Sequence, residues 1–104
     1  MSLPEKKDQT ITLDAASKLT ANYRRVVPPA TVIAAGFWKE TVEKIIDQTG
    51  CVALRVYYGR TADGSPTPVL VAVNENGDDI TAGVLGDENF PCPPFCGAPN
   101  PLNS

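Results

Sequence analysis

Apolar residues recur at helical spacing in the first part of the chain, between residues 10 and 25. The spacing i, i+3, i+4, i+7 predicts a helix with one modest apolar face. Thr12 is placed to cap its first turn, and Pro28 and Pro29 must end it, because proline clashes with the turn before it. The apolar face consists of Ala16, Leu19, Thr20 and Tyr23.

A second helical pattern is the clearest in the chain and runs from residue 37 towards Gly50. One face is mostly apolar and the other is charged, so this helix is predicted to pack its apolar face on the core. Thr31 is a candidate cap, although Gly36 interrupts the start of the pattern, and Gly50 suits the left-handed position that closes a helix. The packing face comprises Phe37, Trp38, Thr41, Val42, Ile45 and Ile46.

Two β-rich runs follow, at residues 51–60 and 67–73, and the Asp-Gly pair between them is typical of a hairpin turn. We therefore predict an antiparallel hairpin. Its second strand is apolar on both faces, which indicates either cover from two sides or an exposed face used for association. Pro66 and Pro68 cannot donate to a ladder, so the start of this strand is predicted to lie at a sheet edge.

The remaining segments set the domain boundaries. Residues 74–79 predict a polar turn, and the sequence leaves open a third short strand at 80–85. Residues 1–9 are predicted to be a flexible tail, and residues 87–104 a Pro-rich, extended one. The predicted fold is a single α+β domain at residues 10–86, in which two N-terminal helices pack on an antiparallel β-hairpin.

Composition narrows the class of function. The chain has 104 residues, enough for one domain, and its net charge of −3 argues against binding a nucleic-acid backbone. The basic pairs Lys6-Lys7 and Arg24-Arg25 are too short to change that expectation. No apolar run is long enough to span a membrane, and no apolar stretch follows the N-terminal lysines. We therefore expect a cytoplasmic protein with no membrane partner.

The absence of histidine removes the commonest general base and the commonest metal ligand together. Without histidine, the serines and threonines cannot form an ordinary nucleophile–base pair. We therefore expect no catalytic residue and no resident cofactor. The neighbouring carboxylates Asp78 and Asp79 are predicted to belong to a solvated turn.

Three cysteines carry the remaining candidate chemistry. Cys92 and Cys96 have three residues between them, a spacing that zinc sites use, and Cys51 could add a third ligand. The lack of a second pair argues against zinc, and the Pro-Pro between the thiols argues against a redox dithiol. An odd cysteine count in a reducing compartment argues against a disulfide scaffold. The preferred prediction is that Cys92 and Phe95 dock on the domain as small apolar plugs, with a disulfide formed under oxidation as an alternative.

Candidate binding residues lie mainly on the hairpin, because tyrosine and arginine are enriched in binding hot spots. Arg55 and Tyr57 are predicted to face away from Leu54 and Val56. The full set of candidate partner-binding residues is Arg55, Tyr57, Tyr58, Arg60, Val69, Val71 and Phe95.

The strand containing RVYYG, the following strand ending near NGDDI and the late CPPFC resemble a group of small uncharacterised bacterial proteins. The resemblance covers residues 50–80 and 91–96. It implies a bacterial origin and a recurring role for the cysteine-containing tail, but neither an activity nor any site residue.

Three hypotheses for the function follow. A two-stranded sheet is marginal alone in water, so the leading hypothesis is a non-catalytic interaction or self-assembling module. It would bind itself or another protein through the hairpin edge and the C-terminal tail. The alternatives are a small metal- or thiol-binding protein that uses Cys92 and Cys96, and a small enzyme with a site in a dimer groove.

Overall fold

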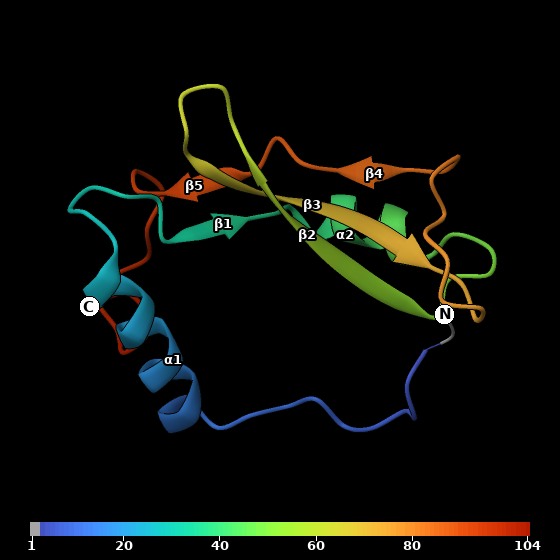
Figure 1. Ribbon diagram of the computed structural model, residues 1–104, viewed down its shortest axis with the longest axis horizontal. Coiled ribbons are helices and arrows are strands. Elements are labelled where there is room, and N and C mark those ends of the chain that lie inside the picture. Colours follow the sequence, from blue (N-terminus) through green and yellow to red (C-terminus); the bar gives the residue numbers. More distant parts are fainter. Residues whose placement is uncertain (1–2) are drawn as a thin grey trace.

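The computed structural model describes residues 3–104, which contain two helices and two antiparallel sheets. This arrangement confirms the predicted α+β class. Figure 1 shows the larger sheet with α2 behind it, and α1 at the far end of the molecule beside the smaller sheet. The elements are α1 (Leu13–Val26), β1 (Ala34–Gly36), α2 (Lys39–Ile46), β2 (Ala53–Arg60), β3 (Pro66–Val73), β4 (Leu85–Gly86) and β5 (Phe90–Cys92).

The predicted hairpin forms the larger sheet, whose strand order is β2-β3-β4. Gly64 in the connecting turn has φ +92°, the left-handed backbone that the Asp-Gly signal favours. β4 pairs only with Leu70 and Val71, so the first half of β3 has no partner on that side, as its prolines predict. The third strand that the sequence left open at 80–85 is the two-residue β4, which overlaps that range only at Leu85 and pairs with the second half of β3.

The core lies between α2 and this sheet. Ile45 is fully buried and packs against Leu70 and Ala72 of β3, as the apolar face of the second predicted helix requires. Gly86 of β4 also approaches closely, because a Cβ placed there would be 2.8 Å from the Ile45 Cδ1 atom. Only a glycine therefore fits opposite this side chain without a shift of the core.

The start of α2 differs from its prediction. The helix begins at Lys39, and Trp38 is its N-cap residue without a side-chain capping bond. Trp38 is 70% exposed and its ring lies 5.3 Å from that of Phe90, so it does not belong to the packed face. Thr31 does not cap this helix either; its hydroxyl donates to the Pro28 carbonyl at 2.6 Å. The segment between them is taken up by β1, which interrupts the helical pattern.

The first helix is present, and its predicted cap is confirmed. The Ala15 N–H donates to Thr12 Oγ1 at 3.1 Å. No residue of α1 is buried, however, and Leu19 remains 62% exposed. The sequence predicted that both helices pack on the hairpin, and α2 supplies the packing observed. α1 instead contacts the C-terminal end of the chain, where Arg24 Nη1 donates to the Leu102 carbonyl at 2.6 Å.

The C-terminal segment is more ordered than the predicted extended tail. β5 pairs with β1 in a second, two-stranded sheet that sets Gly36 against Phe90. A Cβ at position 36 would overlap the Phe90 ring, so the close approach of these strands requires glycine. Cys92 and Cys96 are joined by a disulfide. Residues 90–96 thus belong to the folded structure, which extends past the predicted boundary at residue 86.

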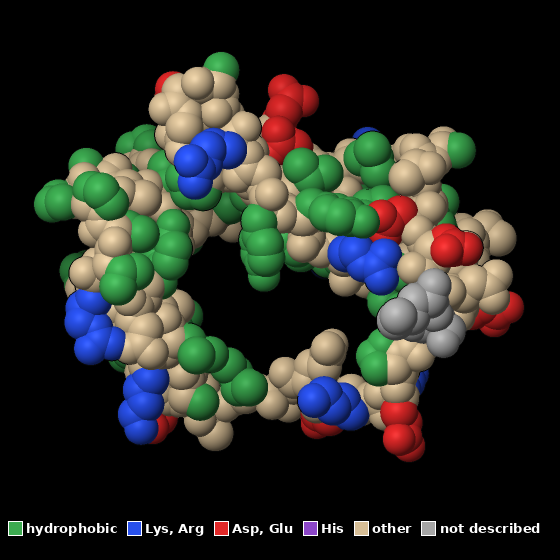
Figure 2. Space-filling model, viewed as in Figure 1, with side chains coloured by type: hydrophobic (Ala, Val, Ile, Leu, Met, Phe, Trp, Pro, Cys, Tyr) green, Lys and Arg blue, Asp and Glu red, His purple; other side chains and the backbone are tan. Residues whose placement is uncertain are grey.

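The molecule leaves an unusually large surface exposed. Its accessible surface is 7930 Å². A compact monomer of the same mass would expose about 5,700 Å². Figure 2 shows the reason, because an opening passes through the molecule between the larger sheet and the segment formed by residues 3–26, which include α1. Within residues 3–104, no helix combines the length and apolar character needed to cross a membrane.

Candidate functional site: the free edge of the hairpin

Among the described residues, no strand lies beside one side of β2, because the order β2-β3-β4 places it at the sheet edge. β2 is eight residues long and contains neither proline nor lysine. Proline, charged side chains (lysine above all) and short length are the usual means by which proteins prevent an edge from pairing with another chain. The charged residues of β2 are Arg55, which is paired with Asp79 of its own chain, and Arg60 at the end of the strand. The opposite side of the sheet has such protection, because Pro66 and Pro68 begin β3 and β4 is only two residues long. The free edge of β2 is therefore a backbone surface that can accept another strand.

Apolar side chains stand beside this free edge. Leu54, Val56 and Tyr58 alternate along β2 and so share the face that carries Leu70 and Ala72 on β3. α2 covers the two β3 residues, but the three β2 residues stay 40%, 43% and 98% exposed in sequence order. We call Leu54, Val56 and Tyr58 the apolar row.

The other face of β2 carries a polar cluster formed by Arg55, Tyr57 and Asp79. Arg55 Nη1 lies 2.5 Å from Asp79 Oδ1 and also donates to the Gly77 carbonyl at 3.3 Å. The Tyr57 hydroxyl donates to the second oxygen of the same carboxylate. The cluster ties the turn after β3 to β2, and beneath it Val71 and Val73 are buried.

The hydrogen bonds of this cluster shift the pKa values of its members. Donation from Tyr57, supported by Arg55, holds the pKa of the Asp79 carboxyl below its usual value despite partial desolvation. The same bond to Asp79 raises the pKa of Tyr57, because the phenol proton is already engaged and the carboxylate opposes a second negative charge. Asp79 raises the pKa of Arg55 as well, chiefly by accepting its hydrogen bond. A carboxylate that stays ionised and a tyrosine that keeps its proton form a structural clamp and do not suit general acid–base exchange near neutral pH.

The turn held by this cluster is built as predicted. Asn74 Oδ1 accepts from the N–H groups of Asn76 and Asp78, both at 3.0 Å. Gly77 has φ +86°, which glycine adopts without strain. The role of Asp79 was not predicted from the sequence, which placed both neighbouring carboxylates in a solvated turn. No local signal identifies it, because its partners lie 22 and 24 residues away.

The candidate partner-binding residues differ in how far their side chains are exposed to solvent. Tyr58 and Arg60 are exposed, Arg55 and Val69 are half-buried, and Tyr57 is exposed beside Asp79. Val71 is only 3% exposed, and it lies on the central strand of the sheet, opposite Arg55 of β2 and Leu85 of β4. Its proposed role in partner contact is therefore corrected to that of a core residue. Phe95 is 64% exposed, so it does not dock as a plug, whereas Cys92 is buried as predicted.

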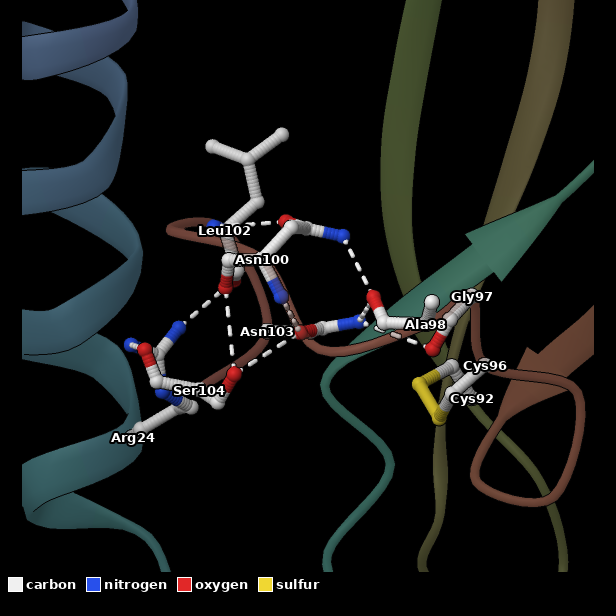
Figure 3. The surroundings of a disulfide bond; sticks show 9 residues. All are labelled: Arg24, Cys92, Cys96, Gly97, Ala98, Asn100, Leu102, Asn103 and Ser104. Atoms are coloured by element: carbon white, nitrogen blue, oxygen red, sulfur yellow. Dashed lines mark hydrogen bonds between the residues drawn. A yellow bond between two sulfur atoms is a disulfide. The ribbon is translucent and has the colours of Figure 1, made fainter.

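The cysteines do not converge on one site. The sulfur atoms of Cys92 and Cys96 are bonded to each other, so in this state neither thiol can ligate zinc. Cys51 is half-buried against the core, and its thiol points to the Ala53 carbonyl at 3.3 Å. Residues 3–104 contain no cluster of three cysteine, aspartate or glutamate side chains that could hold a metal ion. Figure 3 shows the disulfide beside the final turns, where Asn103 Nδ2 donates to the Gly97 carbonyl at 3.2 Å.

An apolar groove lies between α1 and the end of the hairpin that carries the connecting turn. Its volume is about 200 Å³, and its walls include Tyr23 of α1, Ile33, and Tyr58 with Pro66 and Pro68 of the hairpin. Among the described residues, no charged side chain lines it. The groove can accept an apolar group but offers no acid–base pair to a substrate.

No family model, curated protein or solved structure matches this chain. The resemblance to small bacterial proteins therefore has no support from these comparisons.

Proposed function

We propose that the protein is a non-catalytic, self-associating module that pairs with a second copy of itself through the free edge of β2. The observation that carries this proposal is an eight-residue edge that contains no proline or lysine and has no paired strand among residues 3–104. Such edges readily pair with another strand, and an identical strand is always available to a self-associating chain. The apolar row beside the edge adds side-chain burial to the backbone hydrogen bonds.

The surface area of the monomer supports the same proposal. Its accessible surface is 7930 Å². This exceeds the expectation for a compact monomer of this mass by about 2,200 Å². A standard interface removes about 800 Å² from each partner. The opening that produces this excess borders the free edge of β2, as Figure 1 shows, so the exposed surface there includes the edge that the proposed interface would cover.

The C-terminal segment has a smaller part in this proposal than the sequence suggested. β5 and the disulfide tie residues 90–96 to β1, so this stretch cannot serve as a free arm without breaking the smaller sheet. Phe95 stays exposed and can extend an interface. The hairpin edge is therefore the primary contact and Phe95 a secondary one.

The test is the mass of the untagged protein, measured by native mass spectrometry and by light scattering over a wide concentration range. We expect a discrete dimer for the natural sequence. Val56→Lys should produce a monomer, because a lysine in the middle of an edge strand opposes pairing by its charge and solvation. Val26→Lys is the matched control, since Val26 is 79% exposed on α1 and lies off the sheet.

Two results would contradict the proposal. One is a natural protein that stays monomeric at every concentration. The other is equal loss of the dimer in Val56→Lys and Val26→Lys, which would indicate a general effect of added charge. Circular dichroism of both variants must show the natural spectrum, so that a monomer is not confused with an unfolded chain.

A further inference from the structure

We propose that the two β2 strands pair antiparallel with Val56 of each copy opposite Val56 of the other, on the twofold axis. This inference rests on the proposed self-association and assigns its register. The partner is a second copy of this chain, and the residues that set the register are the apolar row together with Arg55 and Tyr57.

Symmetry limits the choice of register. Two identical antiparallel neighbours in one sheet are related by a twofold axis perpendicular to the sheet, which keeps each face on its own side. Residues directly opposite each other point to the same face, and side chains alternate along a strand. The axis must therefore lie midway between one residue and the same residue of the second copy. The central choices for this residue on β2 are Arg55, Val56 and Tyr57.

The side chains distinguish these three registers. An axis at Arg55 sets two arginines directly opposite each other, which is unfavourable. An axis at Tyr57 sets Leu54 against Arg60 of the second copy. An axis at Val56 sets Leu54 against Tyr58 of the second copy and Val56 against its own equivalent, so the whole apolar row is matched with apolar partners.

The polar face fits the Val56 register as well. Arg55 of one copy then lies opposite Tyr57 of the other, an arginine–aromatic pair that is favourable across strands. Asp79 neutralises each Arg55 within its own chain, because its carboxylate lies 2.5 Å from the guanidinium. The two arginines, which become diagonal neighbours, therefore approach as parts of neutral ion pairs.

The pairing joins the two three-stranded sheets into one six-stranded sheet of order β4-β3-β2-β2-β3-β4, and it requires residues 3–26, which lie across the opening from β2 in Figure 1, to move away from this edge. Both α2 helices then lie on the same face, because the twofold axis is perpendicular to the sheet. The two apolar rows form a continuous strip between these helices. This arrangement covers side chains that are exposed on the monomer and gives a sheet of ordinary size.

Cysteine crosslinking tests the register directly, in a Cys51→Ala background so that the introduced cysteine is the only free thiol. Directly opposite Cα atoms in an antiparallel pair lie about 4.5–5.5 Å apart, within the range that a disulfide spans. Val56→Cys should therefore form a covalent dimer on mild oxidation. Leu54→Cys alone and Tyr58→Cys alone should not, because each lies about 13 Å along the strand from its own equivalent. A mixture of those two variants should crosslink.

The outcomes separate this inference from the proposed function. The pattern above supports both. A dimer by native mass spectrometry in which Val56→Cys crosslinks with Tyr58→Cys would overturn the register and leave self-association intact, since that pair is opposite only when the axis lies at Tyr57. A protein that remains monomeric in the uncrosslinked state overturns both.

Discussion

Replacing Ile45 by alanine tests the account of the core most severely. Ile45 is fully buried and is the residue through which α2 contacts Leu70, Ala72 and Gly86. The change removes three carbon atoms, worth about 2.4 kcal/mol of lost burial. Gly86 has no side chain that could move into the space, so a cavity should persist and add about 1 kcal/mol. We expect a total loss of about 3–4 kcal/mol in the free energy of unfolding.

This loss is large for a domain with so little core. A chain of this length is ordinarily stable by about 5–15 kcal/mol, and one with such a large exposed surface should lie near the lower limit. The alanine variant should therefore remain folded by only about 1–2 kcal/mol. Ile45→Val, which removes one carbon, should cost about 0.5–1.5 kcal/mol. The neighbouring Ile46→Ala is the matched control, since Ile46 is 42% exposed and should cost less than half as much as Ile45→Ala.

The assay is urea unfolding followed by far-ultraviolet circular dichroism at one fixed protein concentration. The concentration must be fixed because a self-associating protein gains apparent stability from mass action. If Ile45→Ala and Ile46→Ala lose the same free energy, the packing of α2 on β3 and β4 described above is incorrect. If Ile45→Val costs as much as Ile45→Ala, the loss comes from strain and not from a cavity.

Three further predictions concern other contacts. Asp79 contributes stability above its unfolded pKa of about 3.9, and this contribution is lost as the pH falls through its lower folded value. The urea midpoint of the natural protein should therefore fall more steeply in acid than that of Asp79→Asn, and equal slopes would show that this carboxylate is not linked to folding. Gly36→Ala should displace the Phe90 ring, change the near-ultraviolet circular dichroism and destabilise by about 1–3 kcal/mol, whereas Gly97→Ala should be silent because its nearest neighbouring atom is 4.0 Å away. Cys96→Ser should lower stability by about 2 kcal/mol through the small disulfide loop, and an unchanged urea midpoint would contradict that.

The sequence predicted correctly those elements that are formed by residues close together in the chain. The cap at Thr12, the Asp-Gly turn of the hairpin and the Asn74 turn each depend on residues within a few positions of one another. Ile45 was predicted as a core residue for a similar reason, since its helical spacing marks the packed face of α2. These elements need no knowledge of the rest of the chain.

The elements that were missed depend on contacts between distant segments. β1 is a three-residue strand of Ala, Ala and Gly, which has no β-rich signature, and it exists because β5 pairs with it. In the helical pattern Gly36 is an interruption, whereas in the structure it is the position on which the Phe90 ring packs. The exposure of α1 was equally unpredictable, because an apolar stripe at helical spacing does not specify which surface covers it.

The two edges of the larger sheet differ in their protection against pairing, and this difference determines how many copies the proposed assembly contains. A free edge that pairs with a second free edge can lead to open-ended growth if another edge remains available. In the larger sheet, β2 is the long unprotected edge, while the opposite side carries Pro66, Pro68 and the two-residue β4. Pairing of β2 with β2 is isologous and consumes this edge in both copies at once, leaving two protected edges on the six-stranded sheet. The sequence of the hairpin therefore favours a closed dimer over a filament, and the mass of the assembly should not increase beyond two copies as the concentration rises.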